Sequence, residues 1–126
     1  MVTILVDTSV WSDYMKTKND ELAKLLASDL VVTHPLIIGE IACGTPHDRK
    51  PMIVMLNELK QTRQPSIKDV LSFIENEKLY GHGCGIVDIT ILTACLVTPN
   101  TKIWTLDKRL KALADRFNVM YQPTLH

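Results

Sequence analysis

The chain opens with Val2-Thr-Ile-Leu-Val6 and continues directly into Asp7-Thr-Ser9. A short continuous apolar run, rich in β-branched residues, is typical of a strand that a parallel sheet buries on both faces. The polar residues that follow end this strand. The stretch therefore predicts a buried strand over residues 2–6 with a carboxylate at its carboxyl end.

Further along the chain, short apolar stretches alternate with helical patterns. Pro35 suits the first position of a helix, and Gly44 and Pro46 stop that helix. Ser66 begins another helix as a capping residue. We expect strands at 30–33 and 102–105, an edge strand at 119–121, and helices from residue 10, from residue 20, and at 36–43, 51–60, 66–79, 86–97 and 107–116. This order predicts an α/β fold, a single domain over residues 1–126 with a short central parallel sheet flanked by helices.

Composition narrows the class of protein. The 126 residues include 14 Lys and Arg and 14 Asp and Glu, so the formal net charge is zero and a general nucleic-acid coat is disfavoured. Residues 86–97 form the longest apolar stretch, and it is shorter than the roughly 20 residues that a membrane span needs. Cys43, Cys84 and Cys95 show no C-x-x-C spacing, so we expect small core residues in a reducing cytoplasm rather than disulfides.

Four acidic residues stand where exposed acids are unusual. Asp7 directly follows a predicted strand, and Asp107 comes two residues after another. Glu40 and Asp88 have only uncharged residues three and four positions away on their predicted helices. Capping of a helix would also explain Asp7 and Asp107, and a helix dipole would explain Asp88. Four unpaired carboxylates at one sheet edge would repel one another unless protons or cations lay between them. Because the ligand atoms are all oxygens, the cations that suit them are Mg²⁺ and Mn²⁺.

The sequence around these acids resembles the PIN-domain endoribonucleases, and in particular the VapC-type toxins of bacterial toxin–antitoxin pairs. The likeness covers nearly the whole chain and rests on four segments in the family's order. These segments are Val6-Asp-Thr-Ser-Val-Trp11, Ile38-Gly-Glu-Ile-Ala-Cys-Gly44, Gly85-Ile-Val-Asp-Ile-Thr-Ile-Leu-Thr-Ala94 and Ile103-Trp-Thr-Leu-Asp107. The resemblance implies that Asp7, Glu40, Asp88 and Asp107 are catalytic, metal-binding acids, with Thr105 and Ser9 as hydroxyl support. Many relatives carry another acid where this chain has Arg109, so the sequence leaves open whether one or two metal ions bind.

The same resemblance implies a function. We expect Mg²⁺-dependent hydrolysis of RNA, with Mn²⁺ as a substitute, by a toxin that inhibits translation by cleaving tRNA or rRNA. A cognate small antitoxin, a homodimer and a cytoplasmic location are expected in the same way. RNA also requires a basic rim around the acids, and the candidate residues are Lys108, Arg109, His82 and Arg63.

Two other functions fit parts of the sequence. One is a catalytically inactive PIN-like or receiver-like regulatory binding module, against which the retention of all four acids argues. The other is a phosphotransferase or phosphatase with Asp7 as nucleophile. Such an enzyme would carry a second Asp close to the nucleophile, and Asp7-Thr-Ser9 lacks one. The glycine loop Gly81-His-Gly-Cys-Gly85 lacks the G-x-G-x-x-G spacing and is interpreted as a hinge rather than a nucleotide loop.

Overall fold

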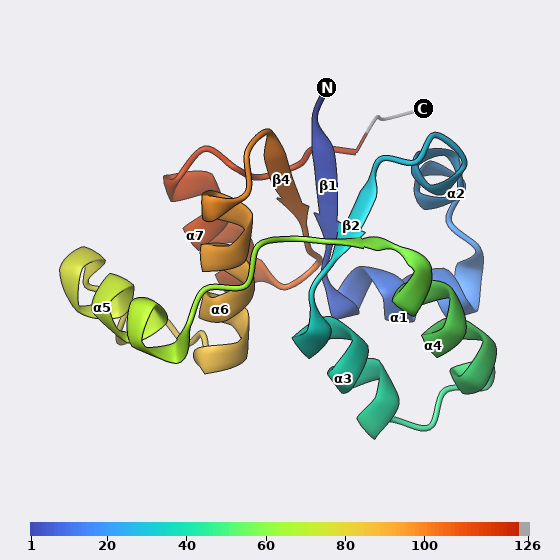
Figure 1. Ribbon diagram of the computed structural model, residues 1–126, viewed down its shortest axis with the longest axis horizontal. Helices are drawn as coiled ribbons and strands as arrows, with labels where there is room; N and C mark the ends of the chain where they lie inside the picture. Colours follow the sequence, from blue (N-terminus) through green and yellow to red (C-terminus); the bar gives the residue numbers. More distant parts are fainter. Residues whose placement is uncertain (124–126) are drawn as a thin grey trace.

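A computed structural model describes residues 1–123, over which helices surround a four-stranded sheet (Figure 1). The elements in chain order are β1 (Thr3–Val6), α1 (Thr8–Thr17), α2 (Asp20–Ala27), β2 (Val31–Thr33), α3 (Pro35–Cys43), α4 (Arg49–Glu58), β3 (Lys60–Gln61), α5 (Ile67–Glu77), α6 (Ile86–Val97), β4 (Thr101–Trp104) and α7 (Lys108–Arg116). The predicted α/β fold with a short central parallel sheet is confirmed.

The sheet has the strand order β3-β2-β1-β4, and each neighbouring pair is parallel. Leu5 of β1 stands opposite Val32 of β2 on one side and Ile103 of β4 on the other. All three side chains are buried, as expected for strands that helices cover on both faces. Because the strands are parallel, the carboxyl ends of β1 and β4 lie next to each other at one edge.

The helices divide into two groups around this sheet. In Figure 1, α1 to α4 lie toward β2, whereas α5, α6 and α7 lie toward β4. Helix α6 packs against both β4 and α7, and α5 packs on the outside of α6. Residues 89–95 of α6 are all buried, which explains why the sequence of this helix is apolar on every side.

Several helices begin where the sequence predicts a cap. His34 precedes Pro35 and accepts the Leu36 backbone N–H through Nδ1. Ser66 Oγ accepts the Asp69 N–H at 3.1 Å, which confirms the predicted cap of α5. Asp107 caps α7 by accepting the N–H groups of Arg109 and Leu110.

Three expected elements need correction. Helix α4 begins at Arg49 rather than at Pro51, because a proline is tolerated anywhere in a first turn, where the N–H groups have no partner within the helix. In place of an edge strand at 119–121 there is an isolated parallel bridge between Ile103 and Met120. Strand β3 was not predicted, since it consists of Lys60 and Gln61, which are exposed and polar.

The cysteines differ in their surroundings. Cys95 is buried, and burial raises the pKa of its thiol to about 12. Cys43 is exposed and Cys84 is half-buried, so the expectation of three core cysteines is wrong for Cys43, which lies on the last turn of α3. Over residues 1–123, no helix combines the length and the apolar character that crossing a bilayer requires.

Candidate active site

The four acidic residues singled out in the sequence come from four different elements. Asp7 follows β1 and is the N-cap residue of α1, and Asp107 follows β4 and caps α7. Asp88 lies in the first turn of α6, and Glu40 lies in the second half of α3. The neighbouring positions of β1 and β4 bring the first two to one edge of the sheet.

Asp7 is the most enclosed of these carboxylates, with 6% of its surface exposed. Its Oδ2 atom accepts hydrogen bonds from Ser9 Oγ at 2.8 Å and Thr105 Oγ1 at 2.7 Å. Ser9 Oγ in turn accepts the Leu106 N–H at 2.9 Å, and Thr105 Oγ1 accepts the Asp107 N–H at 3.0 Å. The two hydroxyls therefore fix Asp7 and connect it to the segment that carries Asp107.

Asp107 and Glu40 are held in a similar way. Asp107 Oδ1 accepts the Arg109 N–H at 2.9 Å and the Leu110 N–H at 3.0 Å. Glu40 Oε1 accepts a hydrogen bond of 2.6 Å from Thr8 Oγ1. In Asp7, Asp107 and Glu40, one carboxylate oxygen is thus oriented by donors, while the other has no hydrogen bond within residues 1–123. Each carboxylate is held in place and keeps an oxygen free for a ligand.

The pKa of Asp88 shows how the charges of the other three acids act on its carboxyl group. Burial raises the pKa of its carboxyl, and the negative charges of Asp7, Asp107 and Glu40 raise it further, against a hydrogen bond with the Gly85 backbone. Asp88 is therefore close enough to each of the other three acids to be repelled by its charge. The side-chain ion pairs in the described part of the chain join Lys18 to Asp48 and Arg116 to Glu77, so none of them neutralises this group.

These observations test whether a divalent cation fits the site. The donors are carboxylate and hydroxyl oxygens, which hard cations such as Mg²⁺ prefer, and the negative charges of Asp7, Asp107 and Glu40 that act on Asp88 favour a positive charge beside it. Among residues 1–123, no three acidic, histidine or cysteine side chains stand close enough to hold one ion between them. Mg²⁺ in proteins keeps several waters and takes one or two carboxylates directly, so a site for it does not require three protein ligands around one ion.

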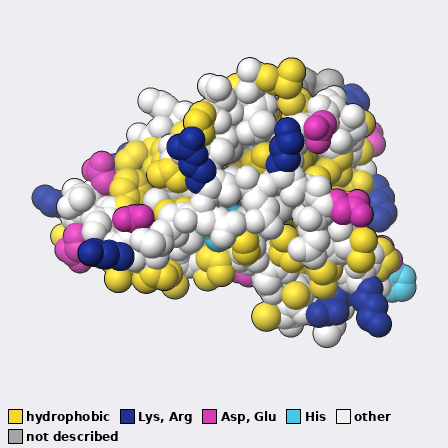
Figure 2. All heavy atoms as spheres, viewed as in Figure 1, with side chains coloured by type: hydrophobic (Ala, Val, Ile, Leu, Met, Phe, Trp, Pro, Cys, Tyr) yellow, Lys and Arg dark blue, Asp and Glu magenta, His cyan; other side chains and the backbone are white. Residues whose placement is uncertain are grey.

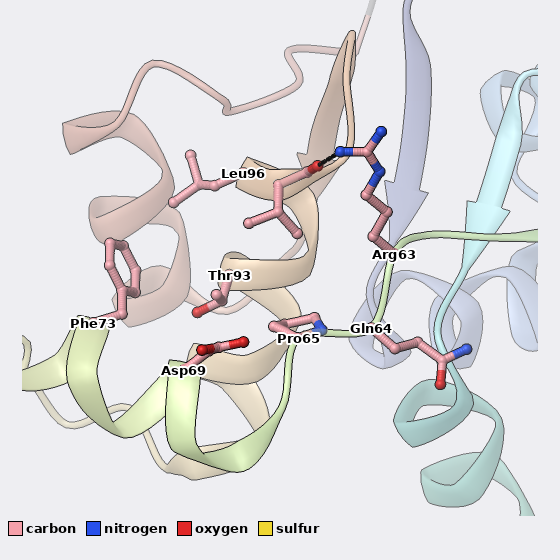
Figure 3. A pocket seen from close by; sticks show the side chains of 8 residues that line it. Arg63, Gln64, Pro65, Asp69, Phe73, Thr93 and Leu96 are labelled. Atoms are coloured by element: carbon pink, nitrogen blue, oxygen red, sulfur yellow. Dashed lines mark hydrogen bonds between the residues drawn. The ribbon is translucent and has the colours of Figure 1, made fainter.

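The predicted RNA-binding residues are not all in one place. Lys108 and Arg109 lie on the exposed first turn of α7, beside Asp107. His82 lies in the exposed loop before α6, with its Nε2 atom 3.2 Å from the Lys78 carbonyl oxygen. Arg63 instead bonds to the Val97 carbonyl at the far end of α6 (Figure 3). About nine residues of helix, or roughly 13 Å, separate Val97 from Asp88.

Arg63 lines a separate pocket of about 370 Å³ between the segment before α5, α5 itself and α6. In Figure 3, Asp69 and Phe73 of α5 face Thr93 and Leu96 of α6 across this space. None of the four acids lines it. The pocket is therefore distinct from the candidate active site.

Cationic side chains are dispersed on the face of the molecule seen in Figure 2. Lys and Arg side chains alternate there with hydrophobic and acidic ones and form no continuous basic surface. This distribution agrees with the balanced net charge. Any attraction for a polyanion on this face has to be local.

One supporting residue was missed in the sequence. Thr8 stands between Asp7 and Ser9 and donates its hydroxyl hydrogen to Glu40. In the motif Asp7-Thr-Ser9, the sequence assigns site roles to the first and third residues only, whereas the side chain of the middle residue contacts Glu40 on α3. The signal in the sequence that could have identified Thr8 is the pair of consecutive hydroxyl residues after Asp7.

The short parallel sheet and the acids that four elements bring toward one edge agree with the PIN-domain resemblance of the sequence. No protein-family model matches the chain. The chain is 37% identical over 109 residues to Ribonuclease VapC32 of Mycobacterium tuberculosis, from strain CDC 1551 / Oshkosh and equally from strain ATCC 25618 / H37Rv. The alignment covers 86% of this chain and 88% of the relative. The chain therefore belongs to the VapC family, and the resemblance found in the sequence is confirmed.

Proposed function

We propose that this protein is a metal-dependent endoribonuclease that hydrolyses RNA phosphodiester bonds. The observation that carries the proposal is that three acids without an ion pair, Asp7, Glu40 and Asp107, repel the charge of Asp88 in a chain similar to a protein named a ribonuclease. Asp7, Glu40, Asp88 and Asp107 are the proposed catalytic residues, and Ser9 and Thr105 support Asp7. The cofactor is Mg²⁺, for which Mn²⁺ substitutes.

The metal would be held by the carboxylate oxygens that have no hydrogen bond within the described chain. Bound there, a divalent cation would make water a usable nucleophile near neutral pH and would offset the charge that develops on the phosphate. The chain's own contribution is to fix geometry: Ser9 and Thr105 orient Asp7, Thr8 orients Glu40, and the first N–H groups of α7 orient Asp107. The N-terminal ends of α6 and α7, where Asp88 and Asp107 lie, add partial positive charge beside the acids.

RNA has to approach this acidic group against repulsion. Lys108 and Arg109 follow Asp107 on α7, and His82 lies in the loop that leads to Asp88 on α6, so these three are the proposed contacts to the RNA backbone. Arg63 is further away and would contact only RNA that extends along α6. Phosphate contacts of this kind are sequence-independent and sensitive to salt.

The biological part of the proposal follows the family. The protein acts as the toxin of a toxin–antitoxin pair in the cytoplasm, inhibits translation by cleaving tRNA or rRNA, is held inactive by a small cognate antitoxin, and forms a homodimer. Residues 1–126 act as a single domain. Membership of the VapC family supports the biological statements, and the cluster of buried hydrophobic residues within residues 1–123 supports the single domain.

The activity is tested with purified protein and total cellular RNA. We expect cleavage in Mg²⁺ or Mn²⁺ that stops in excess chelator, and loss of cleavage in Asp7→Asn. The matched control is Asp115→Asn, because Asp115 is an exposed acid at the opposite end of α7 from Asp107. Cleavage by Asp7→Asn at the wild-type rate, or equal loss in the Asp115 control, would contradict the assignment.

The RNA target is identified in cells. Sequencing of 5′ ends after induction of the wild type, compared with Asp7→Asn, should show new ends confined to tRNA or rRNA. A receiver-like module would instead leave RNA intact and become covalently labelled by a small phosphodonor. New ends spread evenly over messenger RNA would contradict the proposed target.

A further inference from the structure

The loop before α6 contacts the first turn of α7 through a glycine. Gly83 has φ +83°, a conformation that L side chains rarely adopt, and its carbonyl oxygen accepts a long hydrogen bond of 3.5 Å from an Arg109 terminal nitrogen. A Cβ atom at residue 83 would lie 2.6 Å from Arg109 Cδ and 2.9 Å from Nε. The Arg109 side chain therefore lies directly over Gly83, in space that only glycine leaves open.

Arg109 is held near the acids without being paired to any of them. The Arg109 backbone N–H bonds to Asp107, and its guanidinium contacts Gly83 in the loop that leads to Asp88 on the first turn of α6. In agreement with this placement, burial, Asp88 and Asp107 raise the pKa of the Cys84 thiol, and Arg109 lowers it. Arg109 forms no side-chain ion pair within residues 1–123. The guanidinium has five N–H donors. Within residues 1–123, one of them is hydrogen-bonded to the Gly83 carbonyl oxygen, and the others remain available to a ligand.

We propose that Arg109 binds a phosphate of the RNA next to the acid group and that Gly83 is the positioning residue that holds its guanidinium there. This inference rests on the proposed ribonuclease function and deepens it. A guanidinium forms two parallel hydrogen bonds to a phosphate, and a fixed side chain loses less conformational entropy on binding. Neither Lys108, which makes no side-chain hydrogen bond or ion pair within the described chain, nor His82, which bonds to the Lys78 carbonyl, has this arrangement.

The chain offers a matched control for Gly83. Gly81 lies in the same loop with φ +79°, but a Cβ atom there meets nothing within 4 Å. Gly81→Ala therefore imposes the same kind of backbone strain as Gly83→Ala without displacing Arg109. Because the atoms in the way at Gly83 belong to a flexible side chain, Gly83→Ala should move Arg109 rather than unfold the loop.

Binding is measured in an Asp7→Asn background so that the RNA stays intact. The probe is a fluorescein-labelled single-stranded RNA of mixed sequence, followed by fluorescence anisotropy in Mg²⁺ over a series of salt concentrations. We expect Arg109→Ala to raise Kd about tenfold, the value of one hydrogen-bonded charge contact. The slope of log Kd against log salt should become shallower by about 0.7, as for one lost phosphate contact on a single strand.

Gly83→Ala should reproduce both changes, Gly81→Ala should produce neither, and Arg109→Lys should recover the salt slope but only part of the affinity. Adding Gly83→Ala to Arg109→Ala should have no further effect, because the obstructed side chain is gone. In the wild-type background, Arg109→Ala and Gly83→Ala should raise KM and leave kcat within about twofold, as expected when a contact binds substrate and transition state equally, whereas Gly81→Ala should leave KM unchanged.

Two results would overturn the inference. One is an unchanged Kd and salt slope in Arg109→Ala, and the other is equal damage from Gly81→Ala and Gly83→Ala, which would attribute the effect to backbone strain. Failure of the wild type to cleave any RNA would contradict the proposed function instead. The binding measurements would still decide the role of Arg109, because they do not depend on cleavage.

Discussion

Substitution of Thr105 by Val removes a hydroxyl at the centre of the candidate active site and keeps the side-chain shape. Thr105 is 1% exposed, and its Oγ1 atom donates to Asp7 Oδ2 at 2.7 Å while accepting the Asp107 N–H at 3.0 Å. Valine can do neither. Asp7 keeps only Ser9 as a donor to Oδ2, and the Asp107 N–H loses the Thr105 oxygen as its acceptor.

The expected loss of stability follows from these two contacts. A hydrogen bond to a charged group contributes about 1.5–3 kcal/mol and a neutral one about 1 kcal/mol, while the added methyl group returns up to about 0.8 kcal/mol. The net loss is therefore about 2–3 kcal/mol. With an unfolding entropy of about 2.1 cal/mol/K per residue near 60 °C, the 126-residue chain should lose about 9 °C in Tm.

The assay is thermal unfolding followed by circular dichroism, with RNA cleavage measured on the same samples. The control is Thr93→Val, because Thr93 is also buried but donates only to the Ile89 carbonyl of its own helix; its Tm should fall by less than about 3 °C. Cleavage should drop in Thr105→Val and remain in the control. A fall in Tm no larger than that of Thr93→Val would refute the assigned role of the Thr105 hydroxyl.

Three further predictions use groups elsewhere in the structure. Asp88→Asn should raise the metal-free stability of the protein at neutral pH. The pKa of Asp88 is higher in the folded protein than its ordinary value of 3.8, so its protonated form stabilises the fold below pH 3.8. This stabilisation is lost as the pH rises through the raised pKa. Denaturant midpoints should therefore converge with those of the wild type in acid, and a difference that persists there would count against the repulsion. Thr33→Val should stabilise the protein by about 1 kcal/mol, because the buried Thr33 Oγ1 has no hydrogen-bond partner in residues 1–123; a lower midpoint would show a missed partner. Tyr121, whose pKa burial and Glu21 raise to about 12, contributes stability that is present below pH 10 and lost on the way to pH 12. The absorbance titration should accordingly contain a late tyrosine component that Tyr121→Phe removes.

Strands β1, β2 and β4 and most helices could be predicted because their patterns are local. Val2 to Val6 is apolar on both faces, and Ser66 has its capping partner three residues away, so short windows of sequence contain the information. Strand β3 could not be predicted, because Lys60 and Gln61 pair with β2 through their backbones alone. Their polar side chains are typical of a short edge strand, which gives no apolar pattern.

In the candidate site too, some residues could be predicted from the local sequence, whereas contacts between distant segments could not. Asp7 and Asp107 were predictable from their positions after strands, and Glu40 and Asp88 from their uncharged helical neighbours. The contact of Thr8 with Glu40 and that of Gly83 with Arg109 depend on how α1 meets α3 and how a loop meets α7. Such contacts between distant segments follow from packing in three dimensions, which residue spacing does not contain.

The wide spacing of the four acids along the chain bears on biosynthesis. Asp7 is translated 100 residues before Asp107, and the α7 backbone N–H groups that orient Asp107 are translated after it. Strand β4 is likewise made long after its sheet partner β1. A polypeptide whose synthesis stops between these positions therefore lacks part of the carboxylate set, and the cell that makes this protein meets the complete set only after the start of α7 has been made.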